Sequence, residues 1–256
     1  MSETLLFTPL TLRDVTLRNR IVVPPMHQYS AVKGFPTDWH LMNAGKFAAG
    51  GAGLVVVEST KVERRGCGTV GDLGIWDDVF IEPLQRLVAF IKQQNAAAGI
   101  QLGHSGRKAR ANRPWEGDGP LLRTPDIHDW EAWTPVAPSA IAHSGKWPVP
   151  RALERHEVKD LVEAWGQGAR RAHQAGFDML ELHGAHGISC TSFSPNAPIS
   201  ALTNMAAPNP TGCASSSKSR KQFGRTGPIA SRCSFGYRWK IMPAGDRNRA
   251  HGWRKF

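Results

Sequence analysis

The sequence predicts an α/β fold with parallel strands over residues 1–187. Apolar, β-branched runs alternate there with segments of helical periodicity, which is the pattern of consecutive βαβ units. The run 53–58 is almost continuously apolar, as in a strand buried on both faces. A doubly wound sheet and a β/α barrel both fit this alternation. No GxGxxG follows the first predicted strand, which weakens the dinucleotide-binding version.

Periodicity and composition define the individual elements. The predicted strands cover 20–25, 53–58, 99–103 and 177–183, and the predicted helices cover 38–49, 81–98 and 157–175. Gly176 is a typical helix stop. Residues 104–154 form a long insertion with several Pro and Trp residues, and loops of that length usually carry function or small elements of their own.

The composition is that of a globular protein, with 41% apolar and 21% charged residues. No run of about 18 apolar residues exists, so we expect no transmembrane helix and no membrane partner. The N-terminus lacks the basic and apolar regions of a signal peptide. The four cysteines form no CxxC pair, which fits a reducing, cytoplasmic location.

Residues 188–256 differ abruptly from the rest of the chain. They hold eleven of the 32 Lys and Arg residues but one of the 21 acidic residues, so most of the net charge of +11 belongs to them. Neither a period of 2 nor one of 3.6 is sustained, and we expect a disordered tail. The alternative is a non-enzymatic short protein whose basic tail binds anionic partners such as nucleic acid. No recognisable nucleic-acid module supports that reading.

Polar residues collect where the predicted strands end, which is where a β/α barrel carries its chemistry. They occupy 26–30, 58–60, 104–108 and 183–186. His183 and His186 are spaced i, i+3 at a strand end, which makes a zinc site improbable and predicts no metal. They are either two ring N–H donors for a substrate oxygen or ordinary loop histidines.

Three other polar positions have competing interpretations. Gln101 interrupts an apolar strand, and its amide suits the edge of a pyrimidine-like ring or is a satisfied core glutamine. Glu58 is either a general base or a barrel residue paired with a neighbour. Arg107 and Lys108 are either an anion site or, more commonly, a solvated loop pair.

Several uncommon motifs occur together and in order. They are LFTPL (6–10), RNRIVVPPM (18–26), GLVVVE (53–58), DLGIW (72–76), IQLGHSGRK (100–108), PSAI (138–141) and GFDMLELHGAHG (176–187). Over residues 4–187 the chain therefore resembles the old yellow enzyme family of FMN-dependent ene-reductases, in its bacterial xenobiotic-reductase-like branch. The resemblance implies the N-terminal part of a (β/α)8 TIM barrel, about four strands, with FMN at the carboxyl ends of the strands.

The resemblance also implies roles for individual residues. Pro25, Met26 and the His27 backbone would lie along the flavin, as would Ser59, while Gln101 would bind its pyrimidine edge. In the same family the two histidines His183 and His186 hold the carbonyl oxygen of an α,β-unsaturated substrate, and Tyr29 lines the substrate pocket. NADPH or NADH would reduce the FMN, which would deliver hydride to the substrate β-carbon. A homo-oligomer is compatible with this assignment.

The chain departs from the family pattern at several points. His27 stands where this branch often has Cys, and Ser59 where the family usually has Ala. Ile188 follows HGAHG, where the family has a proton-donating Tyr. The remaining barrel strands, the flavin phosphate site and an arginine beside the flavin have no match.

A shifted reading frame accounts for residues 188–256. Permitted codons for 188–192, read one base out of frame, give Leu-Leu-His-Gln, and those for 201–207 give Ala-Asp-Glu-Tyr-Gly-Gly, both family sequences. The same offset recovers family sequence from 210–224 and 227–239. We therefore interpret 1–187 as the N-terminal half of an FMN-binding barrel, and 188–256 as an out-of-frame tail that leaves the enzyme impaired.

Overall fold

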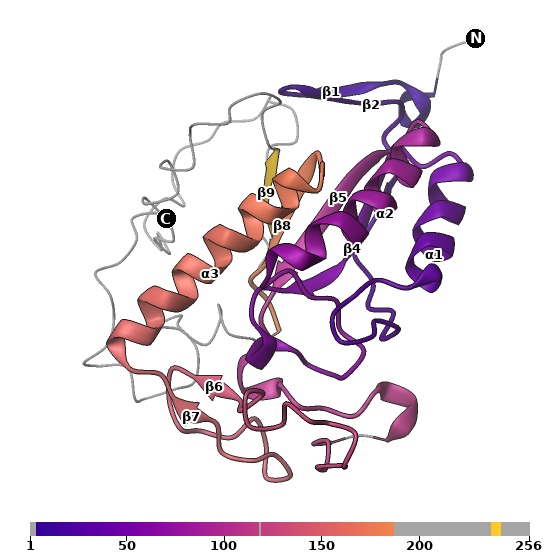
Figure 1. Ribbon diagram of the computed structural model, residues 1–256. Coiled ribbons are helices and arrows are strands. Elements are labelled where there is room, and N and C mark those ends of the chain that lie inside the picture. Colours follow the sequence, from indigo (N-terminus) through magenta and orange to yellow (C-terminus); the bar gives the residue numbers. More distant parts are fainter. Residues whose placement is uncertain (1–3, 118, 187–236, 242–256) are drawn as a thin grey trace.

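The computed structural model describes residues 4–117, 119–186 and 237–241, the last segment as backbone alone. Its centre is a sheet of strand order β3-β4-β5-β8-β9 (Figure 1). Strands β3 (Val22–Val23), β4 (Leu54–Lys61), β5 (Ala97–Gly103) and β8 (Met179–His183) are mutually parallel. The helices α1 (Asp38–Ala49), α2 (Ile81–Gln93) and α3 (Arg155–Gln174) connect successive parallel strands.

The main hydrophobic core lies between this sheet and the three helices. Because side chains alternate along a strand, β4 sends Val55 and Val57 to the helices, and β5 sends Ile100 and Leu102 there. The apolar faces of the helices cover them, with Leu84, Leu87, Val88 and Ile91 from α2 and Ala169 and Ala172 from α3. The helical spacing seen in the sequence is therefore the packing surface of the sheet.

The opposite face of the sheet, called the inner face below, would line the interior of the expected barrel. At its amino end, Leu17, Leu54, Val56 and Met179 form a second apolar cluster. The antiparallel hairpin of β1 (Leu10–Leu12) and β2 (Val15–Leu17) supplies Leu17 to it. Toward the carboxyl end the inner face becomes polar, since Ser59 is in register with Gln101, and Gln101 with Glu181.

The long insertion 104–154 packs back onto the strand ends. It contains two short parallel strands, β6 (Val136–Ala137) and β7 (Arg151–Ala152). Trp133 is fully buried, and its Nε1 donates a hydrogen bond to the Cys67 carbonyl at 2.8 Å. This anchor fixes the insertion against the loop that follows β4.

Several boundaries differ from those expected from the sequence, and two of them have a clear physical reason. The first strand covers only Val22–Val23 rather than 20–25, because Pro24 and Pro25 have no backbone N–H for the ladder. The helix expected over 81–98 ends at Gln93, since Asn95 adopts a positive φ of 60° and the chain enters β5 at Ala97.

Of the tail 188–256, the structure describes one segment. Tyr237–Ile241 forms β9, antiparallel to β8 and paired from Met179↔Ile241 to His183↔Tyr237. In this segment the expectation of a disordered tail is wrong, because the unpaired edge of β8 offers backbone partners to any extended segment. The other tail residues lie outside the described part. Among the described helices, none has the length and apolar content that crossing a membrane requires.

Candidate functional site

A row of polar side chains crosses the inner face of the sheet near its carboxyl end. Gln101 Nε2 donates to Glu181 Oε1 at 2.6 Å, and both residues are buried. Burial raises the pKa of Glu181, and its Oε2 has no hydrogen-bond partner among the described residues. Gln101 keeps one amide hydrogen and its Oε1 for another ligand. It is therefore not a fully satisfied core glutamine.

A charged network lies one step further along β4. Lys61 Nζ is 3.1 Å from Ser59 Oγ, 3.3 Å from His27 Nε2 and 3.5 Å from Asp72 Oδ2. On its other side, the His27 ring places Nδ1 3.0 Å from Glu58 Oε2. The network links the loop after β3 to the end of β4.

Glu58 proves to be a paired barrel residue, one of the two readings of the sequence. It is buried, and its Oε1 lies 3.0 Å from His40 Nε2 of α1. Burial opposes ionisation, but the hydrogen bonds from His27 and Gln28 N and the nearby His40 ring prevail and lower the pKa of Glu58 to about 2. An ionised carboxylate held this way is a weak general base at neutral pH.

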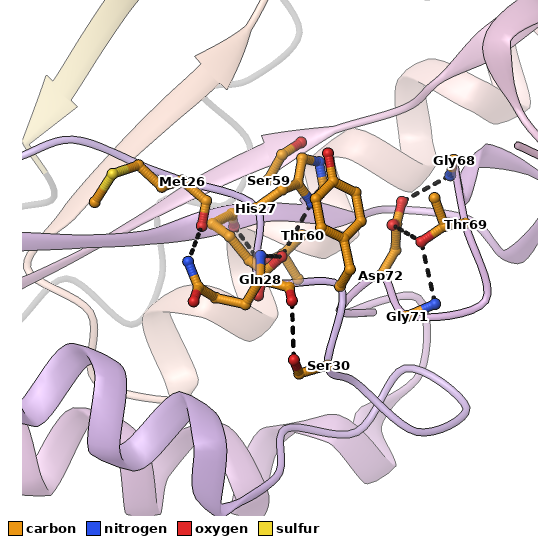
Figure 2. A network of polar contacts seen from close by, with 12 residues as sticks. Met26, His27, Gln28, Ser30, Ser59, Thr60, Gly68, Thr69, Gly71 and Asp72 are labelled. Carbon is orange, nitrogen blue, oxygen red and sulfur yellow. Dashed lines mark hydrogen bonds and ion pairs between the residues drawn. The ribbon is translucent and has the colours of Figure 1, made fainter. Parts of the chain in front are cut away.

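The loop 26–30 crosses over the strand ends in a constrained conformation. Tyr29 has a φ of 55°, and its ring stacks on His27 with centroids 5.1 Å apart. Burial, together with the charges of Asp72 and Glu58, raises the pKa of Tyr29. In Figure 2 the side chain of Gln28 turns back so that its Nε2 donates to the Met26 carbonyl at 2.8 Å. Pro25 and Met26 precede this turn, and Met26 is exposed.

A cavity of about 250 Å³ opens beside this loop. Its lining includes His27, Tyr29, Asp72, Lys108 and Trp147. Aromatic rings and a few polar groups are the usual lining of a small-molecule site. Tyr29 therefore lies on the wall of this cavity.

His183 and His186 lie together at the end of β8, with ring centroids 5.4 Å apart. Burial, aided by the nearby positive charges of Lys61 and other groups, lowers the pKa of His183 to about 4. Its Nδ1 has no hydrogen-bond partner among the described residues. The carbonyl of His186 accepts a hydrogen bond from Lys108 Nζ at 2.6 Å. At neutral pH the His183 ring is thus uncharged, with one N–H to donate.

The solvated-pair interpretation of Arg107 and Lys108 is wrong for Arg107, which is 8% exposed. Sequence reasoning also missed Lys61 and Glu181. Both follow from strand alternation, because Lys61 lies two residues after Ser59 and Glu181 two residues before His183. Their burial on the inner face required the register of three neighbouring strands.

Comparison with known proteins identifies the family of the chain. The family model described as "NADH:flavin oxidoreductase / NADH oxidase family" matches residues 5–197. The chain belongs to this family. It is the old yellow enzyme family, which implies FMN as cofactor and a nicotinamide nucleotide as reductant.

Individual relatives agree with this assignment. An NADH:flavin oxidoreductase of Gibberella zeae is 43% identical over 192 residues, which are 75% of this chain and 46% of that protein. An NADPH dehydrogenase of Bacillus cytotoxicus is 42% identical over 193 residues, 75% of this chain and 50% of that protein. The chain thus spans about half the length of the curated relatives it matches.

Solved structures of the same family confirm the fold. Morphinone reductase is similar with a TM-score of 0.62 and 28% identity, over 73% of this chain and 50% of its own. Morphinone reductase in complex with tetrahydroNAD has a TM-score of 0.62 and 29% identity, over 75% of this chain and 52% of its own. The old yellow enzyme segment is therefore the N-terminal part of a TIM barrel, as the sequence predicts.

The inner face fits the polar edge of FMN. The flavin pyrimidine edge presents one N–H donor between two carbonyl oxygens, and Gln101 retains both a donor and an acceptor. Gly103 has no Cβ, and a Cβ there would lie 2.1 Å from Ser59 Oγ, so the Ser59 hydroxyl fills that position on the inner face. The free donor and acceptor of Gln101 suit the cofactor that the old yellow enzyme family implies.

Proposed function

We propose that the chain is the N-terminal half of an FMN-dependent ene-reductase. When bound, FMN would supply the hydride chemistry between NADPH or NADH and the β-carbon of an α,β-unsaturated carbonyl compound, and solvent would supply the proton for the α-carbon. One observation carries this proposal. The His183–His186 pair lies at the carboxyl end of the same strands whose inner face carries Ser59, Gln101 and Glu181.

The proposed roles follow the chemistry of each side chain. His183 and His186 donate ring N–H bonds to the substrate carbonyl oxygen, where negative charge develops as hydride arrives. The lowered pKa of His183 keeps its ring neutral at pH 7, so it donates without carrying a full charge of its own. Tyr29 lines the pocket, which is accessible to a small molecule.

The remaining residues serve the cofactor. Gln101 binds the pyrimidine edge of FMN, and Ser59 lies against the ring. Pro25, Met26 and the backbone of His27 flank the flavin from the loop after β3. This set contains no phosphate-binding group, so we propose that the chain binds FMN weakly and is impaired as an enzyme.

The impairment has a proposed genetic cause, a one-base deletion near codon 187 that puts 188–256 out of frame. Sequencing the gene across codons 180–256 tests it directly. An additional base near codon 187 would restore the family sequence and place the deletion in the sequencing, whereas the frame as given would make the gene a truncated gene or a pseudogene. A salt-sensitive nucleic-acid complex that disappears on deleting 188–256 would instead favour a basic binding arm.

The activity is tested by FMN titration and by 2-cyclohexenone-dependent oxidation of NADPH. We expect turnover in the frame-restored protein, and its loss by about two orders of magnitude on His183→Ala or His186→Ala, the usual cost of removing an oxyanion donor. His156→Ala is the matched control, because the His156 side chain is 70% exposed on α3. Absence of enone-dependent oxidation in the frame-restored protein rejects the ene-reductase. Stoichiometric FMN in the 256-residue chain rejects the impairment.

A further inference from the structure

Lys61 is a buried cation that neither the family roles nor the sequence analysis explains. It ends β4 on the inner face, and its side chain is 4% exposed. An ammonium has three N–H donors, and each has a partner here, namely Ser59 Oγ at 3.1 Å, His27 Nε2 at 3.3 Å and Asp72 Oδ2 at 3.5 Å. Its orientation is therefore fixed by the fold.

The charge of Lys61 is only partly compensated. Asp72 is the one carboxylate within 4 Å of its Nζ in the described part of the chain, and the Nζ–Oδ2 distance is long at 3.5 Å. Asp72 also accepts hydrogen bonds of 2.7 Å from Gly68 N and from Thr69 Oγ1, as Figure 2 shows. The other two partners of Lys61 are neutral. Because burial strengthens electrostatic interactions, a cation held this way acts on groups that enter the barrel interior.

His27 transmits this charge in a defined form. A carboxylate only accepts hydrogen bonds, so the Nδ1 that faces Glu58 carries the ring proton. An ammonium only donates, so the Nε2 that faces Lys61 is the acceptor. The two neighbours together select the neutral Nδ1–H tautomer of His27.

The neighbouring strand allows Ser59 and Lys61 to meet on the inner face. Lys61 is in register with Gly103 of β5. A Cβ at Gly103 would lie 2.1 Å from Ser59 Oγ and 3.6 Å from Lys61 Nζ. The absence of a side chain at Gly103 therefore lets the Ser59 hydroxyl occupy this position and contact Lys61.

We propose that Lys61 tunes the flavin site electrostatically, acting beside Ser59 and through His27 as a positioning residue. This inference rests on the proposed FMN function. Hydride transfer from NADPH or NADH gives the flavin two electrons and one proton and leaves the oxidised nicotinamide. A positive charge near the ring favours the electron-rich reduced flavin over the oxidised one. Lys61 thus shifts the redox balance of the site toward reduced FMN.

The test compares dissociation constants of the full chain for oxidised FMN and, under anaerobic conditions, for reduced FMN. The variant Lys61→Met keeps the length and removes the charge. We expect it to lower the preference for reduced FMN about tenfold, which equals about 30 mV in a two-electron potential. Asp72→Asn removes the negative charge beside Lys61 and is expected to raise the preference for reduced FMN. The control Lys46→Met, exposed on α1, is expected to leave it unchanged. An unchanged preference in folded Lys61→Met overturns the proposal.

A second measurement needs no cofactor. In protein labelled with ¹⁵N-histidine, the chemical shift of His27 Nε2 reports whether this nitrogen accepts a hydrogen bond. We expect it to move toward the unbonded value in Lys61→Met and to stay fixed in Lys46→Met. If the wild-type chain binds no FMN, the proposed function fails for this chain. The chemical shift of His27 Nε2 still shows whether Lys61 acts on His27. An Nε2 shift that is the same in Lys61→Met and wild type shows that Lys61 does not act on His27 and overturns the proposal.

Discussion

Gln101 and Glu181 form a buried pair across β5 and β8, with Gln101 Nε2 2.6 Å from Glu181 Oε1. The carboxyl group restricts which way the amide of Gln101 faces, since an acceptor opposite it requires the NH₂ group on that side. The Glu181 carboxyl group depends on Gln101 in turn, because Glu181 Oε2 has no hydrogen-bond partner among the described residues.

A double-mutant cycle measures this dependence. Gln101→Leu removes the partner of a buried carboxyl group and is expected to lower the free energy of unfolding by about 1–3 kcal/mol. The double variant Gln101→Leu/Glu181→Leu is expected to recover most of the loss, since replacing both polar partners by apolar groups is nearly neutral. Urea unfolding at pH 7 provides the free energies. If the single and double variants are equally unstable, the two side chains are not coupled.

Gly71 sets the position of the Tyr29 loop. A Cβ at Gly71 would lie 2.1 Å from the carbonyl oxygen of Tyr29, and the Gly71 carbonyl accepts a hydrogen bond from Ala31 N at 3.0 Å. Because backbone atoms cannot move aside as a side chain can, Gly71→Ala is expected to lower the free energy of unfolding by about 1–3 kcal/mol.

Gly166 is the matched control for Gly71. It lies inside α3, and a Cβ there meets no atom within 4 Å. Gly166→Ala is therefore expected to stabilise the fold by about 0.5–1 kcal/mol. Thermal unfolding followed by circular dichroism measures both changes in stability. If both variants are stabilised or both are destabilised, the close contact between Gly71 and Tyr29 does not explain the effect.

Trp133 anchors the long insertion through one hydrogen bond and one ring contact. Its Nε1 donates to the Cys67 carbonyl, and the Arg64 guanidinium lies 4.0 Å from its ring centroid. Trp133→Phe leaves the Cys67 carbonyl with only the 3.4 Å hydrogen bond from Arg110 N and is expected to cost about 0.5–1.5 kcal/mol of unfolding free energy. Trp115 is 66% exposed, so Trp115→Phe is expected to change it by less than about 0.5 kcal/mol. Chemical denaturation measures the unfolding free energies of both variants, and equal losses would show that Trp133 does not anchor the insertion.

The folded state loses stability in acid partly through His183. Its pKa is lowered from 6.5 to about 4, so between these pH values the unfolded chain binds a proton that the folded chain does not. The free energy of unfolding therefore falls as pH falls through this window. One proton contributes at most about 1.4 kcal/mol per pH unit, and less for this half-buried ring because solvent screens it.

The variant His183→Gln isolates this contribution, because glutamine does not titrate. Glu181 acts in the opposite direction, since its raised pKa stabilises the fold at low pH and the effect is lost as pH rises. Subtracting the pH profile of His183→Gln from that of the wild type removes such common contributions. A flat difference between pH 6.5 and 4 would show that the His183 ring is not buried as described.

The fold was predictable where local pattern and packing agree. The helix 38–49 and the four parallel strands follow from periodicity, since their apolar residues are the ones that pack in the core. The grouping of Tyr29 and His183 near strand ends was predicted from the sequence, whereas their roles and that of Gln101 stay predictions. Lys61 and Glu181 were not predicted, because each looks like an ordinary strand charge until the register brings it beside Ser59 or Gln101.

The strand β9 has a consequence for any attempt to complete the barrel from a second piece. It occupies the hydrogen-bonding edge of β8 over five register pairs, in the antiparallel direction. A parallel barrel strand supplied in trans needs the same backbone groups and must therefore displace β9 before it can pair. Fragment complementation of this chain is thus a strand exchange, and removing Tyr237–Ile241 is expected to accelerate it. Kinetics of association with and without that segment measure the competition.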